Sequence, residues 1–209
     1  MKLINLFEDS QLSGHKELVA LVKRECSPFL KIIKDPTEHL LLRGLYPSFR
    51  MKKILDDKVI RADVRKDRRP TDTSKDVSEF VDNWLDRKFD GRFRSEALFC
   101  VGDKRLASKY GQVHVILPIG GFNYCWSPKY SDFYQDNARL VDSYSESSDD
   151  TYWENIKQAL EDGKYTDKKM VDAITKFPRH EIMLNCDSYF AMPLDYFNKN
   201  FVPAWEAFK

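Results

Sequence analysis

The 209-residue sequence has no excess of charge of either sign, since 34 Lys and Arg residues stand against 33 Asp and Glu residues. This balance excludes the overall positive field that dominates non-specific nucleic-acid binding, although local clusters can still bind phosphates. No apolar run approaches the roughly 18 residues of a transmembrane helix. The first residues include Glu8 and Asp9 and no apolar core, so we expect neither a membrane partner nor a secretory signal.

Cysteine is scarce, and the four cysteines form no Cys-x-x-Cys pair. Their wide spacing argues against a disulfide framework or a zinc site, and it favours reduced, buried thiols in a cytoplasmic protein. The sequence also lacks a Gly-x-Ser-x-Gly motif, so a hydrolase of the nucleophilic-serine type has no support.

Apolar residues make up 42% of the chain and aromatic residues 13%, which is enough for one large core. Strand and helix patterns mix without regular βαβ spacing, which predicts a single α+β domain over residues 1–209. An N-terminal helical portion spans about 1–36, and a mixed core spans about 37–209. Helices are expected over residues 15–34, 73–88, 152–160 and 167–177, and strands over 40–45, 58–64, 93–100, 113–117, 180–184 and 188–192.

The most informative segment is 92–120. Phe93, Ser95 and Phe99 share one face of a period-two pattern, which predicts that Ser95 lies on a strand. A glycine-containing turn and a short helix follow, and the helix ends near Gly111. A hydroxyl beside aromatic rings on a rigid strand is a suitable place to hold a flat ligand.

Arg43 and Glu181 are the charged residues whose surroundings are most unusual. Arg43 lies in the run LLLRGL, and an arginine among leucines is costly to bury unless it is paired or bound to an anion. It is either a fork that grips phosphate or carboxylate, or a strand-end residue that faces water or an ion-pair partner. Glu181 precedes apolar residues in HEIML, as a solvated edge residue or as a carboxylate at the lip of a cleft.

Two further segments can contact a ligand. The stretch from Arg61 to Arg69 mixes arginine with aspartate, which fits either a solvated loop of ion pairs or a contact for phosphates. The run GGFNYCWSP over 120–128 is predicted to be an aromatic loop that plugs the core or stacks on a base.

Taken in order, the runs LLRG, ALFCVGDKRLASKYG and HEIML followed by SYFAM resemble the ADP-ribosyltransferase superfamily. The resemblance covers roughly residues 39–192 and implies two small β-sheets around an NAD cleft, with peripheral helices. It implies that NAD is consumed as a substrate and that no metal is needed. The catalytic residues that it implies are Arg43, Ser95 and Glu181, and the NAD contacts are Arg43, Gly44, Ser95, Phe99 and Tyr110.

The sequence departs from the family pattern in two places. Ser95 lies before ALF rather than after it, so Phe99 is a second candidate for the middle position. Arg179 stands two residues before Glu181, where arginine-modifying members have Glu or Gln, which leaves the acceptor open. The run VRKDRRP loosely resembles the Arg-Asp-x-Arg-Pro-Pro run of toxin members, and the expected acceptor contacts are Arg65, Arg68 and Arg69.

These features predict an NAD-dependent ADP-ribosyltransferase, a glycosyltransferase that modifies a protein or nucleic acid as a toxin or phage effector does. The alternative is a non-catalytic protein that binds protein or nucleic acid through its loops or its 61–69 segment. Binding of NAD distinguishes the enzyme from the alternatives, and a steep salt dependence favours nucleic-acid binding.

Overall fold

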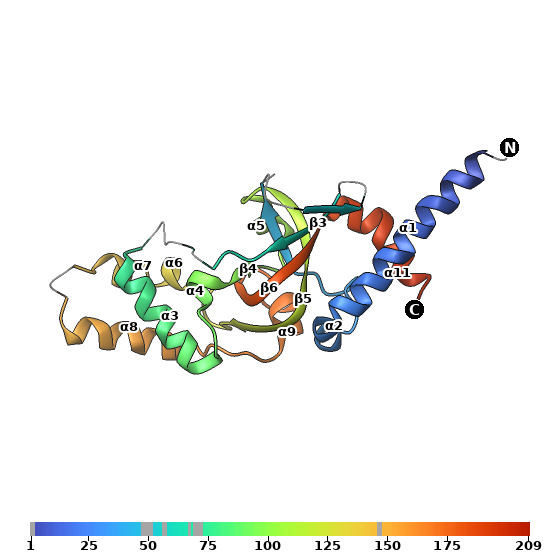
Figure 1. Ribbon diagram of the computed structural model, residues 1–209. Helices are drawn as coiled ribbons and strands as arrows, with labels where there is room; N and C mark the ends of the chain where they lie inside the picture. The colour runs from blue at the N-terminus through green and yellow to red at the C-terminus, as the bar shows by residue number, and fades with distance from the viewer. Residues whose placement is uncertain (1–2, 47–51, 56–57, 67, 69–72, 146–147) are drawn as a thin grey trace.

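The computed structural model describes residues 3–46, 52–55, 58–66, 68, 73–145 and 148–209. Within them the chain folds into helices at both ends of a central antiparallel sheet, as Figure 1 shows. The expected α+β fold class is therefore confirmed. No helix in these ranges has the length and apolar character needed to cross a membrane.

The N-terminal helical portion consists of α1 (Leu3–Glu25) and α2 (Ser27–Ile33). Pro28 lies in the first turn of α2, where its missing N–H leaves no helical hydrogen bond unmade, so the helical region continues past it. At the C-terminus, α10 (Leu194–Tyr196), the π-helical turn η1 (Phe197–Phe201) and α11 (Val202–Glu206) pack beside α1.

The sheet has the strand order β1-β5-β6-β3-β2, and β4 also pairs with β6. β3 and β4 pair with different halves of the same edge of β6, and a bridge between Leu42 and Val101 joins the end of β4 to β1. The expectation of two separate sheets is wrong, because all strands in the described ranges belong to one sheet. The strands are β1 (Leu42–Leu45), β2 (Lys52–Leu55), β3 (Val59–Asp63), β4 (Leu98–Cys100), β5 (Gln112–Trp126) and β6 (Ile182–Pro193).

β5 and β6 are longer than the sequence suggested. The expected aromatic loop at 120–128 lies mostly within β5, because a register shift between Ile119 and Phe122 absorbs Gly120 at a φ of 71°. The expected hairpin around Asn185 is absent, because Asn123 of β5 lies opposite Asn185 and the pairing continues through the polar residues. In both cases the partner strand satisfies the backbone where the local sequence indicated a break.

The expected strand at 93–100 is shorter and begins later. Residues Phe93–Glu96 form the helical turn α4, and only Leu98–Cys100 form a strand. The cause is Asp82, which is buried on α3 (Lys75–Phe89) and accepts hydrogen bonds from the backbone N–H groups of Arg94 and Ser95 at 2.6 and 3.0 Å. This contact holds the chain in a helical turn, so Ser95 does not lie on a strand.

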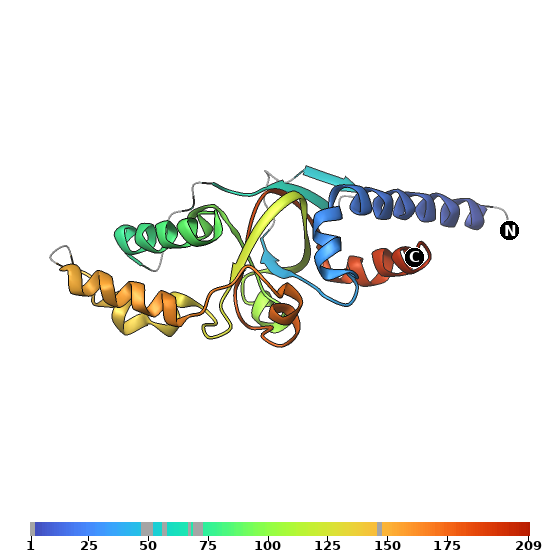
Figure 2. The same cartoon turned by 90° about the horizontal axis from the view of Figure 1, so that it is seen from below.

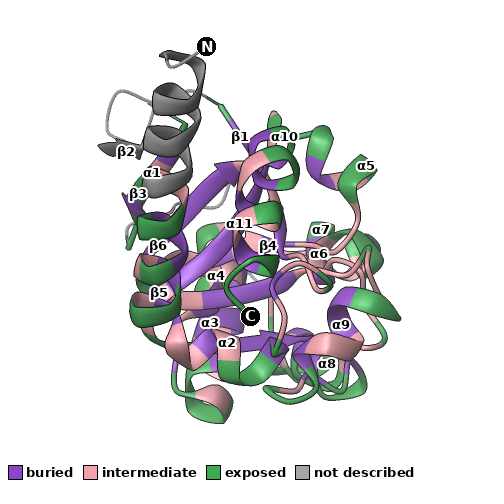
Figure 3. Ribbon diagram, turned by 90° about the vertical axis from the view of Figure 1, so that its right-hand side faces the viewer, coloured by how far each residue is buried: buried purple, intermediate pink, exposed green. Residues whose placement is uncertain are grey.

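The described residues form two apolar cores. The larger one lies on the sheet and beneath α1, α2 and α11. The smaller one joins α3 and α4 to three further helices, α6 (Phe133–Asp136), α7 (Ala138–Asp142) and α8 (Asp150–Asp162). Figure 2 shows that these last helices form one end of the molecule, and Figure 3 shows buried residues running through the sheet. The remaining helices, α5 (Lys104–Ser108) and α9 (Met170–Thr175), pack beside the sheet.

The expected helix over 73–88 and the expected short helix before Gly111 are both present, and the expectation of buried thiols is confirmed. Ser74 caps α3 by accepting a hydrogen bond from the N–H of Val77 at 3.2 Å. Asp103 caps α5 through the N–H of Leu106, and Gly111 follows that helix with a φ of 123°. All four cysteines are buried and carry free thiols.

Candidate functional site

A cavity of about 740 Å³ lies where β1, α5 and β4 meet α4, the loop before α6 and the residues that precede β6. Its lining brings together residues that are far apart in the sequence. Six of the residues singled out from the sequence contribute to it, namely Arg43, Gly44, Arg68, Phe99, Tyr110 and Glu181.

Two of the expected site residues that the structure describes, Ser95 and Arg65, do not line this cavity. Ser95 lies on α4, and its buried hydroxyl has no hydrogen-bond partner. Arg65 is exposed and lies outside the lining, while Arg69 falls outside the described residues. The neighbour of Ser95, Arg94, occupies the cavity instead.

Phe99 on β4 is the centre of a cluster of guanidinium groups. Its backbone carbonyl accepts a hydrogen bond from Nη1 of Arg43 at 2.6 Å. The guanidinium carbons of Arg68 and Arg94 lie over its ring, at 4.6 and 4.7 Å from the centroid. Phe99 therefore positions cations by cation–π attraction, and its ring is engaged before any ligand arrives.

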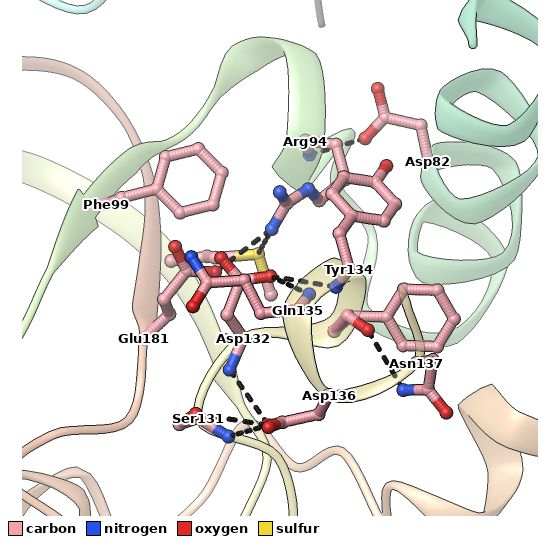
Figure 4. A network of polar contacts seen from close by, with 12 residues as sticks. Asp82, Arg94, Phe99, Ser131, Asp132, Tyr134, Gln135, Asp136, Asn137 and Glu181 are labelled. Atoms are coloured by element: carbon pink, nitrogen blue, oxygen red, sulfur yellow. Dashed lines mark hydrogen bonds and ion pairs between the residues drawn. The ribbon is translucent and has the colours of Figure 1, made fainter. Parts of the chain in front are cut away.

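Arg94 and Glu181 both line the cavity and form an ion pair, as Figure 4 shows. Nη1 of Arg94 lies 3.1 Å from Oε2 of Glu181, and the guanidinium group also lies 4.3 Å from the ring centre of Tyr134. Because Asp82 fixes the backbone of α4, Arg94 is held in place at both ends. Its charge is satisfied within the protein.

The carboxyl group of Glu181 has a pKa near neutrality. Burial is the main cause that raises this pKa, Arg94 opposes the shift and the nearby carboxylate of Asp132 adds to it, and the net value is about 7. Figure 4 shows Asp132 beside Glu181, at the start of α6. A carboxyl group with such a pKa can change its protonation state, or develop charge, at physiological pH.

Besides Arg94 and Glu181, the lining holds four cationic side chains and one carboxylate, that of Asp132. The four cationic residues besides Arg94 form no ion pair with a carboxylate in the part of the chain that the structure describes. Burial first, and then the charges of other arginines with Arg43 foremost, lower the pKa of Arg68 to about 10. Such a group is stabilised by an anion, so the cavity is suited to an anionic ligand. These four residues are Arg43, Arg68, Lys109 and Arg179.

Gly44 shapes the wall of the cavity through its small size. A Cβ atom at this position would lie 2.3 Å from the carbonyl oxygen of Ala107 and 2.6 Å from the backbone of Tyr110. The glycine therefore allows α5 and the turn after it to pack directly on β1. In this structure Gly44 places Tyr110 at the mouth of the cavity.

The described residues contain no group of three or more His, Cys, Asp or Glu side chains placed to hold a metal ion. The imidazole of His180 lines the cavity, and its Nδ1 lies 2.8 Å from the backbone oxygen of Ser127. The lining itself offers carboxyl, guanidinium, ammonium, phenol and imidazole groups, together with hydroxyl groups, an amide and the thiol of Cys100.

Four residues of the site and its support were missed from the sequence: Asp82, Arg94, Asp132 and Tyr134. Asp82 and Arg94 had a detectable signal. Asp82 lies beside Val81 on the apolar face of its helix, and Arg94 lies beside Phe93, so both charges require partners if buried. Asp132 and Tyr134 carried no comparable signal, because they lie in a polar connection whose position depends on the fold.

The comparisons with known proteins found no matching family model, no matching curated protein and no matching solved structure. The candidate site is therefore defined by its own geometry. That geometry is a cationic cavity with one ion-paired carboxyl group whose pKa is near 7.

Proposed function

We propose that the protein is an NAD-dependent ADP-ribosyltransferase with an ADP-ribosyltransferase-like cleft, and that the cavity binds NAD. The observation that carries this proposal is that Arg43, Arg68 and Glu181, from three separate segments, line one cavity. Cleavage of a phosphorylated nucleoside requires groups that bind its phosphates and a carboxylate that stabilises the charge developing on its ribose, and this lining contains both kinds of group.

Glu181 supplies the electrostatic part of the proposed reaction. The bond between C1′ of the ribose and the nicotinamide nitrogen breaks, and its electron pair leaves with nicotinamide. The ionised carboxylate of Glu181 stabilises the positive charge that develops on the ribose. A bond then forms between C1′ and the acceptor, whose proton passes to a carboxylate or to water. The ion pair with Arg94 at 3.1 Å keeps the carboxylate oriented before NAD binds.

Arg43 and Arg68 hold the pyrophosphate in this proposal. The two guanidinium groups contact the backbone and the ring of Phe99 respectively, and Arg43 lowers the pKa of Arg68 through its charge. A diphosphate between them would relieve this repulsion. The proposal therefore moves Arg68 from the acceptor, where the sequence had placed it, to NAD.

The test is transfer of labelled ADP-ribose from NAD by the purified protein and its Glu181→Gln variant. The variant keeps the shape but loses the charge, so we expect turnover to fall about 10²-fold or more while NAD binding is retained. Glu154→Gln, on the exposed face of α8, is the matched control. Full transfer by Glu181→Gln, or no binding of NAD by the natural sequence, would contradict the proposal.

Two further measurements sharpen this test. Arg43→Ala should weaken NAD binding by about 1.5–3 kcal/mol in a calorimetric titration, because a charge-assisted contact is lost. Turnover should rise with pH through about 7, because the reaction needs the ionised form of Glu181. A flat pH profile in the natural sequence would remove Glu181 from the chemistry.

A second candidate is a non-catalytic protein that binds an anionic ligand. The observation that favours it is the ion pair of Glu181 with Arg94, which already occupies the carboxylate in the free protein. In that case the protein would bind NAD or ADP-ribose in the calorimeter, and no nicotinamide would be released at any pH.

A further inference from the structure

The positive charge of the cavity exceeds what a dinucleotide needs. Four cationic side chains have no carboxylate partner among the described residues, whereas the pyrophosphate of NAD presents two phosphates. Arg43 and Arg68 lie beside Phe99 and can bind that pyrophosphate. The remaining two, Lys109 and Arg179, are exposed, so they lie at the outer edge of the cavity.

An exposed aromatic ring also lies at the outer edge of the cavity, next to Lys109 in the chain. Tyr110 lines the cavity and is 57% exposed, which is unusual for a large hydrophobic residue of this chain. It follows Lys109 directly, and its backbone is held by a hydrogen bond to the carbonyl of Ala107 at 3.1 Å and by the close packing on Gly44. The ring is therefore presented on rigid backbone.

We infer that the rim formed by Lys109, Tyr110 and Arg179 binds single-stranded nucleic acid. The phosphates would contact the two cationic side chains, and an unstacked base would lie on the ring of Tyr110. Cationic groups beside an exposed ring are the combination that binds single strands, because every base offers a π-face. A duplex keeps its bases stacked inside, so it could not use the ring.

The inference rests on the proposed function only in naming the strand as the acceptor. Since the three rim residues line the same cavity as Glu181, a strand bound on the rim is the acceptor in the proposed transfer. An acidic peptide would satisfy the two cations but would leave the ring without a planar partner. The exposed ring is therefore the feature that favours nucleic acid over protein.

The experiment is fluorescence anisotropy with labelled single-stranded oligonucleotides, without NAD. Competitors are a duplex hairpin and an acidic peptide. Tyr110→Ala should weaken binding about 5- to 100-fold, and Tyr110→Phe should retain it because the ring remains. The double variant Lys109→Glu/Arg179→Glu should weaken binding and reduce the salt slope by roughly 1.4, about 0.7 for each lost phosphate contact. Lys31→Glu on α2, exposed and outside the cavity lining, is the charge control.

Several outcomes would overturn the inference. They are unchanged oligonucleotide affinity in Tyr110→Ala, an equal loss in Lys31→Glu, and more effective competition by the acidic peptide than by the single strand. An equal loss of NAD affinity in Tyr110→Ala would assign the ring to the NAD site instead. If the protein binds the strand but never cleaves NAD, the proposed function fails while the rim assignment stands.

Discussion

Arg94 and Arg68 lie over the ring of the same phenylalanine, at 4.7 and 4.6 Å, yet their electrostatic surroundings differ. Arg94 is paired with Glu181 at 3.1 Å and contacts a second ring, so the fold itself satisfies its charge. Arg68 has no carboxylate partner in the described ranges, and its pKa is lowered to about 10. Arg94 thus belongs to the framework of the site, and Arg68 is available to a ligand.

Replacement by Met should lower the stability of the protein at Arg94 but not at Arg68. Arg94→Met leaves the carboxyl group of Glu181 buried without its partner, which should cost about 3–5 kcal/mol of unfolding free energy at pH 8. Arg68→Met removes a group that other arginines repel, so stability should be unchanged or slightly higher. Urea denaturation of both variants measures this difference. Equal losses would show that Arg68 is also a structural residue.

The position of Arg94 in the framework of the site depends on Asp82, which holds the backbone of α4. Asp82→Asn can accept only one of the two backbone hydrogen bonds and turns a donor toward the other, so we expect a loss of about 2–3 kcal/mol. Asp86→Asn, exposed one turn later on α3, is the control and should change stability little. Chemical denaturation measures the unfolding free energy of both variants, and a similar loss in both would contradict the role of Asp82.

The cavity wall that faces a ligand depends on the close packing of β1 against α5. Gly44→Ala would place a methyl group 2.3 Å from a backbone oxygen and should cost about 2 kcal/mol or more in thermal or urea unfolding. Gly121→Ala, which meets no atom within 4 Å, is the matched control and should have a small effect. If the two variants are equally stable, α5 does not rest on Gly44 as described.

The smallest expected effect concerns the pH dependence of stability. The pKa of Glu181 is raised from 4.5 to about 7 in the folded protein, so the folded state retains a proton that the unfolded state has released. This contribution is fully present below about 4.5 and is lost as the pH rises through about 7. The stability of Glu181→Gln relative to the natural sequence should therefore increase, by about 1 kcal/mol, between pH 6 and 8. A difference that is constant with pH would show that the pKa of Glu181 is not raised.

Several features of the protein follow from the sequence alone. The α+β class, the capped helix α3, the turn before α5 and the strand positions of Arg43 and Phe99 are set by local patterns of apolar residues, caps and glycine. The same patterns singled out Arg43 and Glu181 as charges in apolar surroundings. Such features depend on neighbours within a few residues, so the sequence is sufficient to predict them.

Tertiary structure decided the rest of the site. Ser95 and Arg94 were assigned to a strand by their alternation, and only Asp82, a residue of another helix, turned that segment into α4 and brought Arg94 into the cavity. β5 and β6 pass through residues that locally favour breaks, because each supplies the other's backbone hydrogen bonds. Arg68 is held near Phe99 by a hydrogen bond from its backbone N–H to the carbonyl of Ser95, a residue distant in the sequence, at 3.2 Å. Contacts between distant segments are set by pairing and packing, which no local window of the sequence contains.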